Sequence, residues 1–316
     1  LEAAEYVCSG AGLHPGKIAE LLEQLLRKSL IHINEDRVRY GMLATIRQYA
    51  WEKLTQSGIQ YEVSQRYFAY TLAFMERADQ MIRGPEQIAW LGRIDQEHEN
   101  ILHALTMAIN TPGNYELGVR LINRLHHYWI LRGKGVLADY WMAKVSGPIG
   151  ELERNTVKGE FLFHYGGYSV LGKRWLEPVK AHALTLESLE IWEELGPDYQ
   201  VEVAKCLVAL GFSKIKFVHE ADGWETMYRG IQIFEDAGET WWQAWSCIAL
   251  GNVMDPEDKA FSDLLEKMER LWAETGDPWH YAYPFDFQGG LALYTGDYEK
   301  ARDNFQHGLE IFRKYG

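Results

Sequence analysis

Two short stretches of the sequence come close to known catalytic motifs, and both fail on spacing. A phosphate-binding loop needs Gly, four residues, then Gly-Lys and Ser or Thr. In "GAGLHPGKI" (residues 10–18), Gly12 and Gly16 are one position too close, and Ile18 replaces the magnesium-binding hydroxyl. "HENILH" resembles a zinc-protease motif, but His98 and His103 are five positions apart rather than four. On a helix these two side chains diverge, so we expect neither a phosphate site nor a metal site here.

No other arrangement of nucleophile, base and acid stands out along the chain. His126 and His127 are adjacent, so on a helix they point in different directions, and we interpret them as structural residues. The sequence therefore predicts no catalytic residues, no metal and no cofactor within this chain. A site assembled from distant residues leaves no such pattern, and an enzyme with an unrecognised pocket is an alternative.

Aromatic side chains are the more promising feature for binding. The chain has 12 Trp and 18 Tyr among 316 residues. Trp241, Trp242 and Trp245 crowd one predicted helix, and a helix at the edge of a fold cannot bury every direction. The helices around these rings must therefore position them.

Those elements repeat along the chain. A glycine recurs after gaps of 42, 38 and 40 residues, at Gly196, Gly238, Gly276 and Gly316. An aromatic residue stands four positions before each of them: Trp192, Phe234, Trp272 and Phe312. Another glycine follows three of them: Gly211, Gly251 and Gly289. Such a period predicts stacked helical units, each burying its apolar face on the next.

Each unit is predicted to contain two helices. In the last unit these span residues 279–294 and 298–315, and the second has apolar residues at helical spacing. The glycine after each second helix is expected to end it in the left-handed region. The glycine within each first helix is expected to let a neighbouring helix approach closely. The predicted fold is an all-α helical-repeat solenoid, with an irregular helical bundle as the alternative.

The last unit resembles the tetratricopeptide (TPR) repeat, on the stretch "GDYEKARDNFQHGLEIF" (296–312). The resemblance implies that the first helix of each unit lines the inner wall. Carrying those positions over gives a candidate groove for a peptide, a protein partner or a small-molecule inducer, formed by Lys205, Phe212, Trp245, Asn252, Tyr283 and Asp286. Aromatic rings mixed with isolated polar groups suit such a groove. The alternative is that these side chains pack between adjacent repeats.

The first sixty residues follow a different pattern. Residues 15–29 form an amphipathic helix pattern, residues 30–42 alternate around an "NED" turn as in a β-hairpin, and residues 43–54 are helical again. We interpret residues 1–57 as a truncated winged helix with one small hairpin. Strong helical patterns occur at residues 60–84, 86–109 and 115–145. We therefore interpret residues 58–150 as a helical linker and degenerate repeat, and residues 151–316 as the TPR-like repeats.

The order of these parts is similar to the C-terminal half of bacterial STAND-type signal-transduction ATPases. These are the NB-ARC-containing regulators of the LuxR-like and SARP-like kind. The most specific stretches are "TIRQYAWEKL" (45–54) and "RGPEQIAWLGRIDQEHENI" (83–101). The resemblance implies a sensor and protein-interaction arm, with a nucleotide-binding domain before Leu1 that would hold ATP or ADP. A stand-alone TPR interaction scaffold is the alternative.

One departure from that family concerns nucleotide sensing. Many relatives have a Met-His-Asp signature before the last winged-helix helix, and its His touches the nucleotide. Met42, Leu43 and Ala44 stand at the matching positions here. We therefore expect no direct nucleotide contact from this segment.

Charge and cysteine content limit the partners further. The formal net charge is −13, from 45 acidic and 32 basic residues, so the surface repels phosphate. We expect no direct nucleic-acid partner and no membrane partner, and no apolar run approaches the roughly 20 residues of a membrane span. Three scattered cysteines suit reduced thiols in a cytoplasmic protein.

Overall fold

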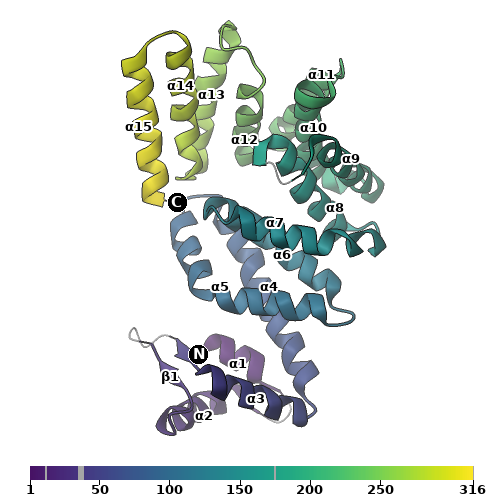
Figure 1. The fold of residues 1–316 in the computed structure, drawn as a ribbon, viewed down its shortest axis with the longest axis vertical. Coiled ribbons are helices and arrows are strands. Elements are labelled where there is room, and N and C mark those ends of the chain that lie inside the picture. The colour runs from purple at the N-terminus through teal and green to yellow at the C-terminus, as the bar shows by residue number, and fades with distance from the viewer. Residues whose placement is uncertain (11–12, 35–38, 174–175, 316) are drawn as a thin grey trace. The chain divides into compact units, whose positions relative to one another are not determined.

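The structure is a computed structural model that describes residues 1–10, 13–34, 39–173 and 176–315. Within these ranges it contains fifteen α-helices, short 3-10 and π-helical turns, and one two-stranded sheet (Figure 1). The predicted class is confirmed, because the chain has an all-α helical-repeat fold with one small β-hairpin. None of the described helices is both long and apolar enough to cross a bilayer.

The chain divides into two compact units. Unit 1 comprises Leu1–Met75 and Ile101–Ala104, and unit 2 comprises Glu76–Asn100 and Leu105–Gly316. The boundary falls within one long helix, α4 (Gln60–Met81), whose residues are shared between the units.

Unit 1 contains the predicted order of helix, hairpin and helix. Its elements before α4 are α1 (Glu2–Cys8), α2 (Pro15–Arg27), β1 (His32–Ile33), β2 (Tyr40–Gly41) and α3 (Ala44–Gln56). Pro15 begins α2, where a missing N–H costs nothing. The strands are antiparallel, with Ile33 opposite Tyr40. The predicted turn residues Glu35 and Asp36 lie outside the described residues.

Unit 2 begins with helices that precede the repeats. They are the end of α4, α5 (Gln87–Asn110), α6 (Tyr115–Leu131) and α7 (Gly135–Ser146). The helical pattern at 115–145 is divided between α6 and α7 at "RGKG" (132–135), where Gly133 has a φ of +60°. Helix α6 is buried on most of its circumference, including Asn123, His126 and His127. Polar groups on such a helix need partners inside the protein.

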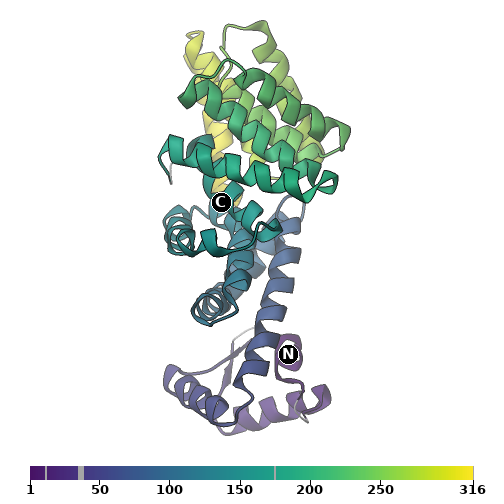
Figure 2. The same ribbon diagram turned by 90° about the vertical axis from the view of Figure 1, so that its right-hand side faces the viewer.

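Four helical pairs follow, in the predicted order. The first joins α8 (Thr156–Leu162), with the π-helical turns η2 (Phe163–Gly167) and η3 (Ser169–Lys173), to α9 (Pro178–Leu195). The others are α10 (Gln200–Ser213) with α11 (Gly223–Asp236), α12 (Thr240–Gly251) with α13 (Lys259–Thr275), and α14 (Tyr283–Tyr294) with α15 (Tyr298–Tyr315). Helices α13, α14 and α15 lie alongside one another (Figures 1 and 2). The aromatic markers Trp192, Phe234 and Trp272 are buried.

The glycines of the repeat serve the two predicted purposes. The markers at the ends of the second helices have positive φ, as expected for helix ends: Gly196, Gly238 and Gly276. Gly316 lies outside the described residues. In the first helix of the second pair, a Cβ on Gly211 would lie 2.6 Å from the backbone N and the Cβ of Met227. Only glycine therefore permits α10 and α11 to pack this closely.

We predict that Gly211→Ala lowers the free energy of unfolding by about 1–3 kcal/mol, because the methyl group must push α11 away. Chemical denaturation monitored by circular dichroism measures this. Gly290→Ala is the matched control, since a Cβ on Gly290 in α14 would meet nothing within 4 Å. The control is expected to be neutral or to stabilise by up to about 1 kcal/mol. Equal effects of the two substitutions would contradict the packing role of Gly211.

Candidate functional site

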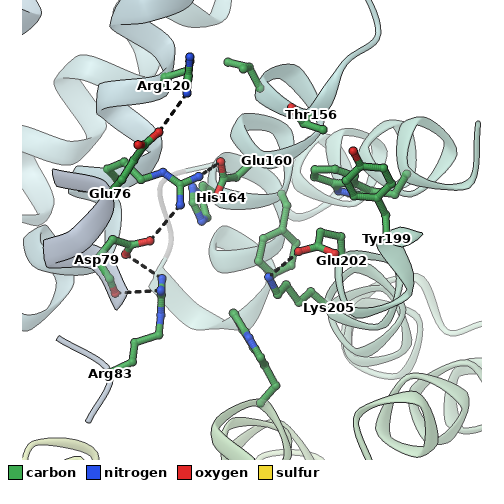
Figure 3. Close-up of a pocket in the computed structure, with 15 residues that line it drawn as sticks. Glu76, Asp79, Arg83, Arg120, Thr156, Glu160, His164, Tyr199, Glu202 and Lys205 are labelled. Carbon is green, nitrogen blue, oxygen red and sulfur yellow. Dashed lines mark hydrogen bonds and ion pairs between the residues drawn. The ribbon is translucent and has the colours of Figure 1, made fainter. Parts of the chain in front are cut away.

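Unit 2 contains a cavity of about 340 Å³, which we call the charged pocket (Figure 3). Its volume lies within the roughly 300–1,000 Å³ that is typical of small-molecule sites. Equal numbers of cationic and acidic side chains line it. The cations are Arg83, Arg120, Arg124 and Lys205, and the acids are Glu76, Asp79, Glu160 and Glu202. Aromatic rings complete the lining, among them Trp192, Tyr199 and Trp242.

Arg124 on α6 organises one wall of the charged pocket. Its Nη1 donates to Asp79 Oδ2 at 3.1 Å, and its Nη2 donates to Glu160. Arg83 reaches the other oxygen of the same Asp79, with Nη2 2.9 Å from Oδ1. The Asp79 side chain is only 3% exposed, so its charge depends on both guanidinium groups. Burial raises the pKa of Glu160 by more than the nearby Arg124 lowers it.

The opposite wall is aromatic. Lys205 on α10 places Nζ 4.5 Å from the ring centroid of Trp242, a cation–π distance. Its nearest carboxylate oxygen is Glu202 Oε1, at 3.4 Å. The ring centroids of Trp192 and Tyr199 lie 5.3 Å apart, and Tyr199 is on the same side of the pocket as Lys205 (Figure 3). This wall therefore combines aromatic rings with the Lys205–Glu202 ion pair.

The π-helical turn η2 brings His164 into the charged pocket. A Cβ on Gly166 would lie 2.8 Å from the carbonyl oxygen of Ala181, so this glycine lets the widened turn rest on α9. His164 stacks on His126, with ring centroids 4.4 Å apart and planes at 5°. Burial, followed by the charges of nearby cations including Arg124, lowers the pKa of His164 well below its usual value. The imidazole is therefore neutral near pH 7.

A second, smaller cavity lies behind the aromatic wall. This inner cavity measures about 60 Å³ and is lined by residues that include Phe212, Trp245, Asn252 and Tyr283. The structure thus brings four of the six predicted groove residues together. Trp241 lines the inner cavity and Trp242 lines the charged pocket. Their rings meet edge to face, with centroids 4.8 Å apart.

The predicted groove residues do not enclose room for a ligand of ordinary size. Trp245 is 8% exposed and packs on Tyr168 and Trp242 within the core. Asn252 Nδ2 donates to the carbonyl of Ile248 on its own helix at 2.7 Å. A volume of this size holds only a few water molecules. The role of these side chains in a groove stays a prediction.

The remaining two predicted residues lie elsewhere. Lys205 lines the charged pocket. Asp286 is exposed on α14 and lines neither cavity, and partial desolvation raises the pKa of its carboxyl group. Lys205 is therefore the predicted residue that lies in the larger cavity.

A buried carboxylate, Asp277, ties distant parts of unit 2 together. Oδ1 accepts from Gln87 Nε2 at 2.9 Å and from the backbone N of Trp279 and His280 at 3.2 and 3.0 Å. Oδ2 accepts from Trp241 Nε1 at 3.0 Å and lies 2.8 Å from His280 Nδ1. We call this set of contacts the Asp277 junction. Burial raises the pKa of Asp277, but His280 and the other donors outweigh it, so the net pKa is lowered.

Asp277 and His280, together with His127, have the side chains of a possible metal site. Ligand atoms of His127, Asp277 and His280 all lie within 4.8 Å of one another. Both Asp277 oxygens are already saturated by five donors, and a carboxylate can only accept, so His280 Nδ1 carries a hydrogen. A metal ion would have to displace these donors. The arrangement therefore serves to hold and orient side chains.

Sequence reasoning missed most of the charged pocket. Its ion pairs join α4, α6 and α8, outside the helices assigned to the groove. One signal was available: Asp79 occurs among Met75, Ala78 and Ile82, apolar residues at helical spacing. A carboxylate on a buried face requires a buried partner.

Comparisons with known proteins assign no family. No family model matches the chain, and no curated protein matches it significantly. Among solved structures, the chain is similar to the crystal structure of BtubC (BKLC) from P. vanneervenii, with 16% identity and a TM-score of 0.45. That match covers 70% of this chain and 90% of the other. A likeness at this level assigns no function.

We predict that Asp277→Asn lowers the free energy of unfolding by about 3 kcal/mol, because the buried donors lose a charged acceptor. Asp303→Asn, at an exposed ion pair with Arg302, is the control and should change stability by less than about 1 kcal/mol. Urea denaturation at pH 7 measures both. A similar small change in the two variants would show that the junction contributes little.

The contribution of Asp277 should also depend on pH. Because its pKa is lower in the folded chain than the ordinary 3.8, its stabilisation is present above that value and is lost as pH falls through the folded pKa. The stability difference between wild type and Asp277→Asn should therefore shrink as pH falls from 7 toward 3. A difference that grows on acidification would contradict the sign.

Proposed function

We propose that this chain is the sensor and protein-interaction arm of a cytoplasmic STAND-type signalling ATPase or transcriptional regulator, and that it binds a small-molecule inducer or a peptide in the charged pocket. The observation that carries the proposal is the pocket itself. A cavity of about 340 Å³ combines an aromatic wall with ionised groups held in place by their own ion pairs.

The lining of the charged pocket suits a binding site because it is preorganised. Arg124 is fixed between two carboxylates, so a ligand does not have to order it. Arg120 and Glu76 are 44% exposed and pair at 3.0 Å, which leaves polar groups accessible to an entering molecule. The partly exposed ring of Tyr199 offers apolar area for binding, and the buried rings of Trp192 and Trp242 support the pocket wall from behind.

The pocket draws its residues from helices far apart in the chain. Glu76 and Asp79 come from α4, Glu160 from α8, Lys205 from α10 and Trp242 from α12. A ligand that contacts several of these helices favours the arrangement in which they are together. Helix α4 continues into unit 1, and this continuity supports a path from the pocket to that unit.

The remainder of the proposal depends on the resemblance in sequence. Unit 1 would act as a winged helix that relays the state of the repeats to an upstream nucleotide-binding domain, where ATP or ADP would bind. We propose no catalytic activity and no direct contact with nucleic acid for this chain.

The proposal is tested by blocking the pocket. A library of several hundred metabolites is screened by thermal shift against wild type and Thr156→Trp, which places an indole at the exposed pocket residue Thr156. Compounds that raise the melting temperature of wild type are expected to lose most of their effect on the variant. Thr295→Trp, at an exposed position at the end of α14, is the control and should keep the wild-type response.

Two results would contradict the proposed function. One is that no compound stabilises wild type. The other is that stabilisation persists unchanged in Thr156→Trp, because the ligand would then bind outside the charged pocket.

A further inference from the structure

The last helical pair exposes side chains at repeat positions that the earlier pairs bury. The second helices α11, α13 and α15 can be aligned on the marker glycine that follows each of them in the sequence. Eleven positions before that glycine stand Met227, Leu265 and Phe305, and their exposed fractions are 0%, 5% and 38%. The same position of the repeat is therefore covered in α11 and α13 and exposed in α15.

A second position of the repeat shows the same difference. Seven positions before the marker glycine, Ile231 on α11 is 8% exposed and Leu309 on α15 is 45% exposed, while α13 has Glu269 there. Phe305 and Leu309 are four positions apart and lie on one side of the helix, and the exposed Tyr298 continues that side toward the start of α15. We call Tyr298, Phe305 and Leu309 the end face.

In the earlier pairs, the residue four positions before the marker glycine is covered by the first helix of the next pair. Phe234 on α11 is fully buried, and the ring of Trp242 from α12 stacks on it, with centroids 6.0 Å apart and planes at 17°. Trp272 on α13 is also fully buried. The ring of His280, in the turn η6 (His280–Ala282) that leads into α14, stacks on it at 4.9 Å and 15°.

Phe312 stands at this position in α15 and is only partly buried. Its aromatic neighbours belong to its own pair, with ring centroids at 4.9 Å for Trp279 and 6.1 Å for Tyr283. Helices α13, α14 and α15 stand in a row, and α15 is the outer one (Figure 1). The end face therefore corresponds to one side of a contact whose other side, in α11 and α13, is an added helix.

The edge of the end face is basic, although the whole chain has a net charge of −13. Arg302 and Arg313 are eleven positions apart, about three helical turns, and so lie on one edge. Arg302 pairs with the adjacent Asp303 at 2.9 Å, and Arg313 has no ion-pair partner among the described residues. Arg313 corresponds to Glu235 on α11, which pairs with Lys267 of the next helical pair at 2.6 Å. The sign is reversed in α15, so the complementary charge is acidic.

We propose that the end face of α15 binds an amphipathic helix of a separate protein, with an aromatic residue in its first turn and acidic residues along one edge. The inference goes beyond the proposed function, because the residues that line the charged pocket all lie between Glu76 and Trp242. A second copy of the chain offers no equivalent helix among the described residues. Its first helices α8, α10, α12 and α14 each already pack against helices that precede and follow them.

The test uses α14 itself as the probe, because this helix covers the corresponding face of α13. A fluorescently labelled peptide of residues 276–294 carries two aspartates and no lysine or arginine. Titration with the full chain, followed by fluorescence anisotropy, should show saturable binding. Leu309→Gln should weaken it about tenfold, since a buried leucine contact is lost. Leu186→Gln on α9 is the matched control, because Leu186 is 42% exposed and should not contact the peptide.

Two further changes test the charge and the aromatic residue of the bound helix. Arg313→Glu should weaken binding of the acidic peptide by about three- to tenfold, because an attraction becomes a repulsion. Lys314→Glu makes the same change of charge on another side of α15 and should have less than about a twofold effect. His280→Ala in the peptide should weaken binding about fivefold or more, because a stacking ring is lost. Circular dichroism confirms that each variant of the chain is folded.

Three results would overturn the inference. The first is the absence of saturable peptide binding. The second is an equal effect of Leu309→Gln and Leu186→Gln, which would place the peptide elsewhere on the chain. The third is a dimer of the chain in sedimentation velocity that Leu309→Gln dissociates, because the end face would then belong to a second copy. Each result leaves the proposed ligand site standing, since the metabolite screen with Thr156→Trp tests the charged pocket alone.

Discussion

A buried carboxylate must be supplied with hydrogen-bond donors, and Asp277 takes five of them from three separate segments of unit 2. Gln87 begins α5, Trp241 lies in the first turn of α12, and the remaining donors come from the segment after α13. The chain must therefore bring these segments together whenever it is folded. The indole N–H of Trp241 donates to Asp277, and the Trp241 ring packs edge to face on Trp242, which lines the charged pocket.

A second polar network meets the first at Arg83. The guanidinium group lies 5.6 Å from the ring centroid of Trp241 and pairs with Asp79, which in turn holds Arg124. Two sets of buried charges thus share the Trp241–Trp242 pair as their common packing surface. Each carboxylate in these two networks has at least one cationic or N–H partner.

The sequence allowed the repeats to be predicted because their packing is local and periodic. The helix predicted at 298–315 has these bounds in the structure, since its apolar residues recur at helical spacing and the turn sequence "TGDY" precedes it. The charged pocket could not be found this way, because Asp79, Arg124 and Glu160 belong to three helices with no common period. Positions carried over from the TPR repeat led to Trp245, but large neighbouring rings leave only a small cavity there.

The central claim is that the charged pocket of unit 2 is a ligand site. A crystal structure of the chain with the compound that raises its melting temperature most is the most direct measurement. We predict electron density for the compound within the charged pocket, in contact with its lining residues. Density on another surface, with the charged pocket unchanged, would contradict it.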